Sequence, residues 1–367
     1  MRFPEFSGEW ERFRNCTLFK VISEKNKNYE FFTVLSASQT EGMVLRDSLG
    51  IDIKFEEDSI KTYKIVRNGD YVAHLRSFQG GFAFSDKTGV CSPAYTILRP
   101  SETISYGFLK PYFMSRKFID SLRIVTYGIR DGKSISVEEW LKLYTCIPKK
   151  NEQQKISKFL RLIDNRIETQ KKIIEDLKKL KDAISFILFT SETCDKWELS
   201  NLATIVMGQS PSSQYYNTDN EGLPLIQGNL DITKGKLTPR IYSSEMTKKC
   251  HTGDVILTVR APVGEVAIAN FDACIGRGVC AIRPFNSTYS VLIYQFLQHY
   301  KPKWISLEQG STFTSVSRND IMSIKIGIPS IQAIELLNIL DDKISIEDVI
   351  LNNLNSQKNY LLTQLFI

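Results

Sequence analysis

The chain has 367 residues, of which 42 % are hydrophobic and 24 % are charged, and this composition excludes a largely disordered protein. Its length suits two domains of about 150 residues each, and no apolar run approaches the roughly 20 residues that a membrane span needs. The 47 Lys and Arg residues against 41 Asp and Glu give a net charge of +6, which permits nucleic-acid binding without establishing it.

The N-terminal segment MRFPEFSGEWERFRN carries Glu5, Glu9 and Glu11 where a secretory signal has its apolar core, so we expect a cytoplasmic protein with no membrane partner. The seven cysteines include no C-x-x-C pair, and the three histidines are isolated. Neither the phosphate-binding motif G-x-x-x-x-G-K-S/T nor the dinucleotide fingerprint G-x-G-x-x-G occurs. We therefore expect no catalytic residues, no metal site and no cofactor in this chain.

Two segments of the chain repeat each other at a constant offset of 184 residues. The matching residues are Gly69-Asp70, Arg76, Gly80, Ala83 and Arg99-Pro100, which recur as Gly253-Asp254, Arg260, Gly264, Ala267 and Arg283-Pro284. Each segment has a Gly-Asp turn, an alternating apolar run, a second turn with glycine and a further strand, which predicts an antiparallel hairpin. Residues 106–122 and 289–300 have a helical pattern. We predict an α+β protein with two mixed α/β domains, each built on a curved antiparallel sheet.

A long helix is predicted after each globular segment. In both helices apolar residues recur alternately three and four residues apart over about four heptads, which is the pattern of a coiled-coil seam. The seam residues are Leu160, Ile163, Ile167, Gln170, Ile174, Leu177, Lys181, Ile184 and Leu188 in the first helix, and Leu337, Leu340, Ile344, Glu347, Leu351, Leu354, Lys358, Leu361 and Leu365 in the second.

The charges of the two helices indicate that they pair with each other. Residues 146–190 carry 11 Lys and Arg against 6 Asp and Glu, a net +5, whereas residues 328–367 carry 2 against 5, a net −3. Opposite charge favours pairing of one helix with the other over pairing of a helix with a second copy of itself. The alternative is that each helix lies against its own domain. Trp10 and Trp197, which open the two domains, are expected in the core beneath the helix junctions.

The sequence therefore divides into a first domain at 1–146, a central helix at 147–190, a second domain at 191–327 and a C-terminal helix at 328–367. The loops at 24–49 and 208–240 are dissimilar between the repeats. The second is rich in Gly, Ser, Asn and Pro, which is typical of exposed loops that carry recognition side chains.

Several of these features together resemble the specificity subunit of a type I restriction-modification system, over essentially the whole chain. They are the opening RFPEFSGEWE, the twofold G-D-x5-R-x3-G hairpin, the strand ends SPAYTILRP and GVCAIRP, and the run IPKKNEQQKISKFLRLIDNRI that leads into a heptad helix ending in LF. The resemblance implies two target-recognition domains that alternate with two antiparallel spacer helices around an approximate internal twofold axis.

The same resemblance implies a non-catalytic role in phage defence. This chain would read two short half-sites in double-stranded DNA, at a spacing set by the helices. Two modification subunits would dock on it and methylate adenine with S-adenosylmethionine, and restriction subunits would add ATP- and Mg-dependent translocation and cleavage. Glu152, Gln153 and Ile156, in the Glu-Gln-x-x-Ile run of the first helix, are candidate subunit-docking residues. The second helix, PSIQAIELLNILDD, lacks this run, which suggests a weaker docking surface on that side.

For contact with DNA we single out Arg76 and Arg260, which follow a strand and precede a turn in both repeats. A guanidinium there reaches phosphates, or guanine in the major groove; the alternative is that each arginine pairs with the nearby Asp70 or Asp254. The other candidates lie in the two dissimilar loops. They are Lys25, Asn26, Lys27 and Arg46 in the first domain, and Gln227, Asn229, Lys234, Lys236 and Arg240 in the second.

Two other interpretations of the sequence stay open. One is a coiled-coil scaffold that binds proteins and no DNA. This interpretation gives no function to the polar loops. The other is a self-contained DNA-modifying enzyme with a degenerate motif. Methylation of DNA by this chain alone would favour the enzyme, and an affinity for DNA that ignores ionic strength would favour the scaffold.

Overall fold

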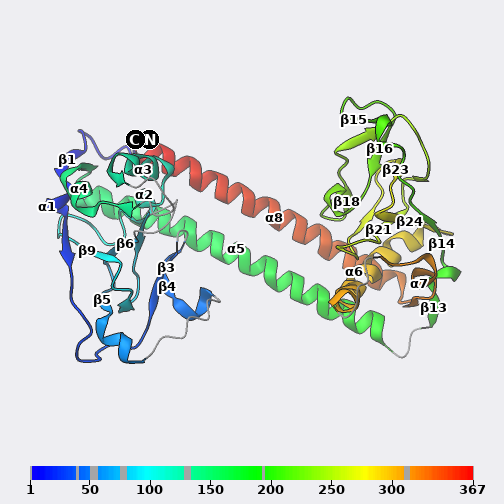
Figure 1. The fold of residues 1–367 in the computed structure, drawn as a ribbon, viewed down its shortest axis with the longest axis horizontal. Helices are drawn as coiled ribbons and strands as arrows, with labels where there is room; N and C mark the ends of the chain where they lie inside the picture. Colours follow the sequence, from blue (N-terminus) through cyan, green and yellow to red (C-terminus); the bar gives the residue numbers. More distant parts are fainter. Residues whose placement is uncertain are drawn as a thin grey trace. The chain divides into compact units, whose positions relative to one another are not determined.

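The computed structural model describes residues 2–38, 41–49, 57–74, 81–127, 134–191, 195–309 and 315–366. The chain divides into two compact units. Unit 1 comprises Met1–Thr169 and Leu351–Ile367, and unit 2 comprises Gln170–Ile350. Two long helices, α5 (Lys150–Thr190) and α8 (Ile331–Leu365), each contribute one part to either unit (Figure 1). Within the described ranges no helix is long and apolar enough to cross a membrane.

Unit 1 is built on a four-stranded antiparallel sheet in the order β2 (Phe19–Ile22), β9 (Thr96–Pro100), β6 (Tyr71–His74) and β7 (Gly81–Phe84). The β6–β7 pair confirms the predicted hairpin, although its tip at 75–80 lies outside the described residues. Four two-stranded pairs surround the sheet: β1 (Glu11–Arg14) with β12 (Tyr144–Ile147), β3 (Leu35–Ser38) with β4 (Gly42–Leu45), β5 (Lys64–Val66) with β8 (Gly89–Cys91), and β10 (Thr126–Tyr127) with β11 (Ser134–Ile135).

Short helices cover this sheet: α1 (Asn15–Leu18), α2 (Lys110–Phe113), α3 (Arg116–Ser121) and α4 (Val137–Lys142). The single helix predicted at 106–122 is broken, because Ser115 takes an extended conformation and its hydroxyl accepts the Phe118 N–H at 3.2 Å, which starts a new helix. Trp10 packs edge-on against Phe108 and against Phe366 near the end of α8, as expected for the junction.

Unit 2 holds two larger sheets. The first has the order β14 (Ala203–Met207), β24 (Val279–Pro284), β21 (Val255–Thr258), β22 (Val266–Ile268), β18 (Lys236–Leu237) and β17 (Ile232–Thr233). The second has the order β15 (Tyr216–Asn217), β19 (Ile241–Ser243), β16 (Leu223–Ile226), β23 (Ala273–Ile275) and β20 (Lys249–Cys250). A separate pair joins β13 (Lys196–Glu198) to β25 (Lys325–Gly327).

The sheets of unit 2 are mixed, which differs from the prediction of antiparallel sheets. The pairs β16–β23 and β18–β22 are parallel, because strands supplied by the long loop at 208–240 join strands of the repeated core. The predicted hairpin β21–β22 is present, and the predicted helix at 289–300 lies within α6 (Thr288–Gln309), which is followed by α7 (Arg318–Met322). Trp197 is 46 % exposed on β13, so its predicted place in the core is wrong.

The repeated Asp and Arg residues form the same buried ion pair in both units. In unit 1 Asp70 accepts two hydrogen bonds of 2.9 Å from Arg99, and in unit 2 Asp254 accepts bonds of 2.9 and 3.2 Å from Arg283. Each aspartate also accepts the backbone N–H three residues before it, which closes the Gly-Asp turn. The partner of Asp254 is therefore Arg283 and not Arg260.

The seam residues of α5 and α8 pair as predicted. In unit 2 the Gln170 amide donates to the Glu347 carboxylate at 2.5 Å, and Lys181 Nζ lies 2.6 Å from Asp341, so the helices are antiparallel. In unit 1 Lys358 lies 2.6 Å from Asp164. Asp164 and Lys181 recur at an offset of 177 as Asp341 and Lys358, so one pair is made twice with the helices exchanged. The twofold occurrence of this Asp–Lys pair reflects the internal pseudo-twofold repeat of the chain.

The Gln170–Glu347 contact predicts an acid-sensitive seam. Hydrogen bonds from Lys343 and from Gln170 hold the pKa of the Glu347 carboxyl below its ordinary value. A depressed folded-state pKa stabilises the protein above the unfolded pKa of about 4.3, and this stabilisation is lost as the pH falls through the folded value. We expect the urea-unfolding free energy of the wild type to fall more steeply between pH 5 and 3 than that of Glu347→Gln. Equal slopes would contradict the assignment.

Candidate nucleic-acid interface

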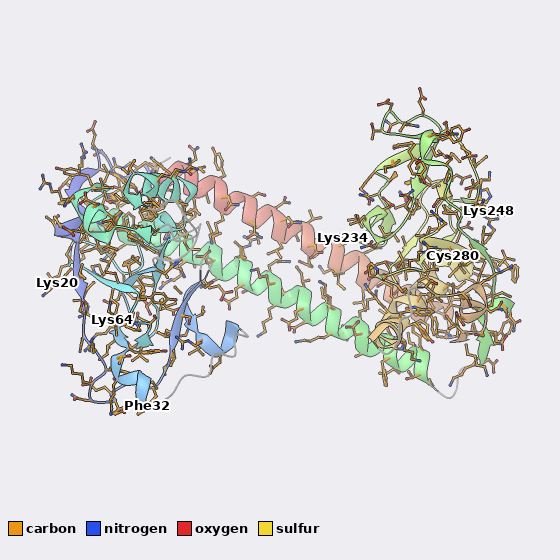
Figure 2. The ribbon with its side chains drawn as sticks, in the orientation of Figure 1. Lys20, Phe32, Lys64, Lys234, Lys248 and Cys280 are labelled. Carbon is orange, nitrogen blue, oxygen red and sulfur yellow. The ribbon has the colours of Figure 1, made fainter. Side chains whose placement is uncertain are left out.

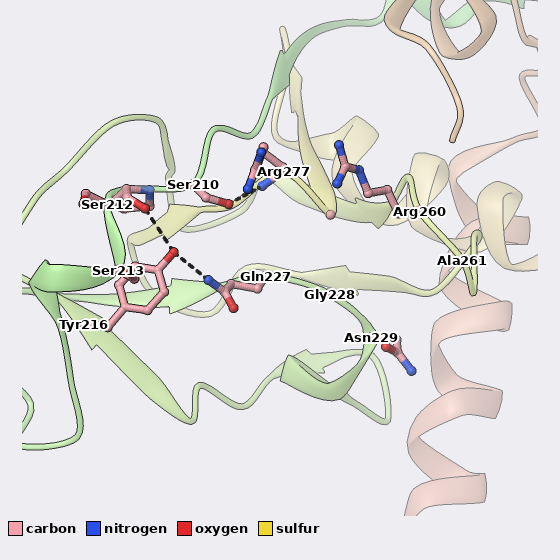
Figure 3. Close-up of a pocket in the computed structure, with 12 residues that line it drawn as sticks. Ser210, Ser212, Ser213, Tyr216, Gln227, Gly228, Asn229, Arg260, Ala261 and Arg277 are labelled. Atoms are coloured by element: carbon pink, nitrogen blue, oxygen red, sulfur yellow. Dashed lines mark hydrogen bonds between the residues drawn. The ribbon is translucent and has the colours of Figure 1, made fainter. Parts of the chain in front are cut away.

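A polar cavity of about 620 Å³ opens in unit 2 where four parts of the chain meet (Figure 3). They are the loop after β14, the segment after β16, and the turns that follow β21 and β23. The residues that line it are Ser210, Pro211, Ser212, Ser213, Tyr216, Gln227, Gly228, Asn229, Arg260, Ala261, Arg277 and Gly278. Hydroxyls, amides and guanidinium groups dominate this list, and it contains no carboxylate.

Glycines bring the backbones beneath the cavity into direct contact. A Cβ at Gly208 would stand 2.1 Å from the Gly276 carbonyl oxygen, and a Cβ at Gly278 would stand 2.0 Å from that of Gln227. Only glycine permits such an approach. Hydrogen bonds fix the polar side chains above them: the Gln227 amide donates to the Tyr216 hydroxyl at 2.9 Å, and that hydroxyl donates to the Pro211 carbonyl at 3.1 Å.

Two arginines at the cavity are exposed and unneutralised. The guanidinium groups of Arg260 and Arg277 make no hydrogen bond or ion pair with any residue that the structure describes, while Ser210 Oγ accepts the backbone N–H of Arg277 at 3.1 Å. A guanidinium binds phosphate oxygens, or the O6 and N7 of guanine, through two parallel hydrogen bonds. Arg277 was missed in the sequence, because a Gly-Arg-Gly turn between two strands has no signal beyond that of a turn.

The other candidate DNA-contact residues in unit 2 differ in whether their side chains already have a hydrogen-bond or ion-pair partner. Arg240 donates to the buried Asp231 at 2.9 Å, and Lys234 lies 2.9 Å from Asp348 of α8 (Figure 2), so both hold the loop in place. Lys236 on β18 is exposed and has no side-chain partner within the described part of the chain. Asn229 lies half-buried at the cavity.

In unit 1 Lys25 and Lys27 are exposed, but the assignment of Asn26 is corrected. Its side chain is 1 % exposed, and its amide donates to the Phe31 carbonyl at 2.7 Å and accepts the Phe31 N–H at 3.2 Å, so it shapes the loop from inside. Arg46 donates to Ser36 and to the Tyr63 hydroxyl. Arg76 lies outside the described residues.

The loop that Asn26 shapes presents an exposed aromatic pair that the sequence did not reveal. Phe32 is 68 % exposed (Figure 2) and stacks on Tyr29 with ring centroids 6.3 Å apart. The Lys61 ammonium lies 4.9 Å from the centre of the Tyr29 ring. An exposed aromatic ring beside a tyrosine that a lysine covers suits contact with nucleobases.

The predicted docking residues are wrong, because all three are buried inside unit 1. Glu152 accepts two hydrogen bonds from Arg2, at 2.6 and 2.7 Å. Gln153 donates to the carbonyls of Pro148 and Thr103 and accepts the Ser105 N–H, while Ile156 is 1 % exposed. The Glu-Gln-x-x-Ile run therefore anchors the start of α5 to its own domain.

A family model described as the type I restriction modification DNA specificity domain matches residues 8–179 and 192–356. The curated protein “Putative type I restriction enzyme MjaX specificity subunit” of Methanocaldococcus jannaschii is 33 % identical over 238 residues. That match covers 58 % of this chain and 56 % of the relative, so the chain spans about half of the relative's length.

Solved structures share the fold at low identity. The S subunit of a type I restriction-modification system from M. genitalium superposes with a TM-score of 0.64 at 16 % identity, with 100 % of this chain and 99 % of that one covered. A chain from work on the assembly and conformational transition of the type I R-M system gives 0.63 at 21 %, covering 99 % and 98 %. The HsdS subunit of Thermoanaerobacter tengcongensis gives 0.50 at 20 %, covering 100 % and 98 %.

Proposed function

Because the chain belongs to the family of type I restriction-modification DNA specificity subunits, we propose that it reads a bipartite target in double-stranded DNA and holds the subunits that act there. Each globular domain reads one half-site, and the pair of helices α5 and α8 sets the distance between the two half-sites. Modification subunits dock on the chain and methylate adenine, and restriction subunits join them in the cytoplasm. S-adenosylmethionine, ATP and Mg act in those partners, and this chain contributes no catalytic residue.

The observation that carries the proposal is one scaffold with two different surfaces. Both units share the Asp–Arg ion pair, the hairpin and the long helix. Unit 2 presents a polar cavity with two unneutralised arginines, whereas unit 1 presents lysines around a stacked aromatic pair. A shared scaffold that presents dissimilar side chains is what two unrelated half-sites require.

The roles of the side chains follow from their chemistry. Arg260 and Arg277 contact phosphates or a guanine edge, and the amides of Gln227 and Asn229 suit an adenine edge. Lys25, Lys27 and Lys236 contact the phosphate backbone, which positions the protein without reading sequence. Arg76 takes the role of Arg260 in the first domain, since the two are repeat-equivalent.

The two arginines provide the direct test of DNA reading. We expect Arg277→Ala and Arg260→Ala each to weaken binding of the modification complex to its target by about 10- to 100-fold, which corresponds to about 1–3 kcal/mol. Arg277→Lys keeps the charge but loses the planar fork, so it separates a guanine contact from a phosphate contact. Arg123, an exposed arginine paired with Asp120, provides the control. The measurement is fluorescence anisotropy at fixed salt.

Mapping of methylated adenines supplies the target and tests the whole proposal. In cells that express the chain with its modification subunit, we expect a two-part motif with a fixed gap that disappears on deletion of the chain. Exchange of one domain should change one half of the motif. A stable complex with no such motif, or with an affinity for DNA that ignores salt, would favour the protein scaffold. Methylation by the chain alone would favour an enzyme.

A further inference from the structure

The side-chain amide of Gln227 is held in one orientation within the polar cavity. Its Nε2 donates to the Tyr216 hydroxyl at 2.9 Å, and that hydroxyl donates to the Pro211 carbonyl oxygen at 3.1 Å (Figure 3). A carbonyl oxygen only accepts hydrogen bonds, so the Tyr216 proton points to Pro211. The Tyr216 oxygen must then accept from Gln227, which places the nitrogen of the amide, and not its oxygen, on that side.

The other side of the amide is open to a ligand. Within the described part of the chain, no residue donates to Gln227 Oε1, and no residue accepts the second N–H of Nε2. Figure 3 shows the oxygen pointing away from the Tyr216 hydroxyl, and Gln227 lines the cavity. The side chain therefore presents one hydrogen-bond acceptor and one donor next to each other.

The backbone at Gln227 is fixed by a buried carboxylate and by two close contacts. Asp231, which is 2 % exposed, accepts the Gln227 N–H at 2.8 Å and the Gly228 N–H at 3.3 Å. A Cβ on Gly278 would stand 2.0 Å from the Gln227 carbonyl oxygen, and a Cβ on Gly276 would stand 3.2 Å from Gln227 Cγ. Because its position is fixed in this way, the orientation of the amide decides what Gln227 binds.

We propose that Gln227 reads the major-groove edge of an adenine in the second half-site, and that Tyr216 is the positioning residue that excludes guanine there. This inference rests on the proposed function. Adenine presents its N6 amino group as a donor and N7 as an acceptor, which match the free oxygen and the second N–H of the amide. Guanine presents two acceptors, and its O6 would face Gln227 Oε1.

The hydroxyl of Tyr216 makes this choice costly to reverse. A reversed amide, with its nitrogen and oxygen exchanged, would donate to guanine O6. The Gln227 oxygen would then lie against the Tyr216 hydroxyl and need its proton, so the Pro211 carbonyl would lose its hydrogen bond. Removal of the hydroxyl removes this penalty, and both orientations of the amide become available.

The test measures discrimination between adenine and guanine in the second half-site. The probes are duplexes with the mapped motif in which one A·T pair at a time is replaced by G·C, titrated with the modification complex by fluorescence anisotropy. For the wild type we expect one pair whose replacement raises the dissociation constant at least about 10-fold. Tyr216→Phe keeps the ring and should reduce this ratio by about 3- to 10-fold, through tighter binding of the G·C duplex.

A matched control and a double variant separate positioning from damage. Tyr215→Phe makes the same change at the neighbouring residue, whose hydroxyl has no partner among the described residues, and should leave the ratio unchanged. Gln227→Ala should lower the ratio at the same base pair. In that background Tyr216→Phe should have no further effect on the ratio, because its action passes through the amide.

The outcomes separate this inference from the proposed function. An unchanged ratio in Tyr216→Phe, or an equal loss of affinity for all duplexes, would overturn the inference alone. A ratio that Gln227→Ala leaves intact at every A·T pair would do the same. Purine, which lacks the N6 amino group, should bind the wild type about 3- to 10-fold more weakly than adenine at the position that Gln227 reads, and equal binding would contradict the contact. A modification complex that prefers no bipartite target would overturn the proposed function itself.

Discussion

Replacing Arg283 by alanine is expected to lower the free energy of unfolding of unit 2 by about 2–3 kcal/mol, because the buried carboxylate of Asp254 loses its ion-pair partner. The Asp254 carboxylate is buried and, among the residues that the structure describes, keeps only the His251 N–H as a donor once the guanidinium is gone. Removing one partner of a buried ion pair leaves an uncompensated charge, which costs about 3–5 kcal/mol. The partial exposure of Arg283 places the expected loss at or below the lower end of that range.

The repeat provides an internal check on this expectation. Arg99→Ala in unit 1 removes the same partner from Asp70 and should cost a similar amount. Arg123→Ala breaks a surface pair with Asp120 and should cost less than about 0.5 kcal/mol. Urea unfolding of the three variants makes the comparison. Equal small losses at all three sites would mean that the repeated ion pair does not hold the fold.

Lengthening both long helices by one heptad is expected to change the DNA target itself. Seven residues inserted after Lys172 in α5 and seven after Val349 in α8 preserve the seam register and add about 10 Å at 1.5 Å per residue. At 3.4 Å per base pair this is about three base pairs. The mapped motif should keep both half-sites while its unspecified gap becomes about three base pairs longer.

Two controls distinguish a change of spacing from general damage. An insertion of five residues in each helix shifts the seam by two heptad positions, and should abolish methylation altogether. Insertion of a heptad in α5 alone leaves α8 too short to match the lengthened α5, and this variant should also lose methylation. A chain with both heptads that still methylates the original gap would show that α5 and α8 do not set the spacing.

The repeat and the heptads were sufficient to predict the two hairpins and the seam between the two helices, down to the polar breaks at Gln170 and Lys181, while the antiparallel direction of the seam came from the family resemblance. The spacing of residues within one helix or one hairpin depends only on the local sequence, so it can be recognised without knowing which elements lie next to it in the fold. The partner of Asp254 was not predictable in the same way, because it depends on which strand becomes the neighbour of β21, and Arg283 lies 29 residues away. The parallel pairs of unit 2 were missed for the same reason, since loop strands find their neighbours only in the folded sheet.

The candidate site was predicted less well, because charge and polarity indicate neither burial nor partners. Glu152 and Gln153 at the start of a helix read as surface residues, yet Arg2 and the carbonyls of Thr103 and Pro148 enclose them. Asn26 looked like a recognition side chain and instead caps its own loop. Arg260, predicted to contact DNA, lines the cavity, and its neighbour Arg277 joins it there only when β23 and β24 are in place.

The discontinuity of unit 1 has a consequence for synthesis on the ribosome. Unit 2 is one uninterrupted stretch, whereas unit 1 needs residues on both sides of it, among them Leu365 and Phe366, which pack into the same core as Trp10 and Phe108. The domain that emerges first therefore stays incomplete until the end of α8 has been made, and unit 2 folds before it. A chain truncated after Ile350, the last residue of unit 2, should expose an unfinished first domain to proteases while its second domain is already resistant.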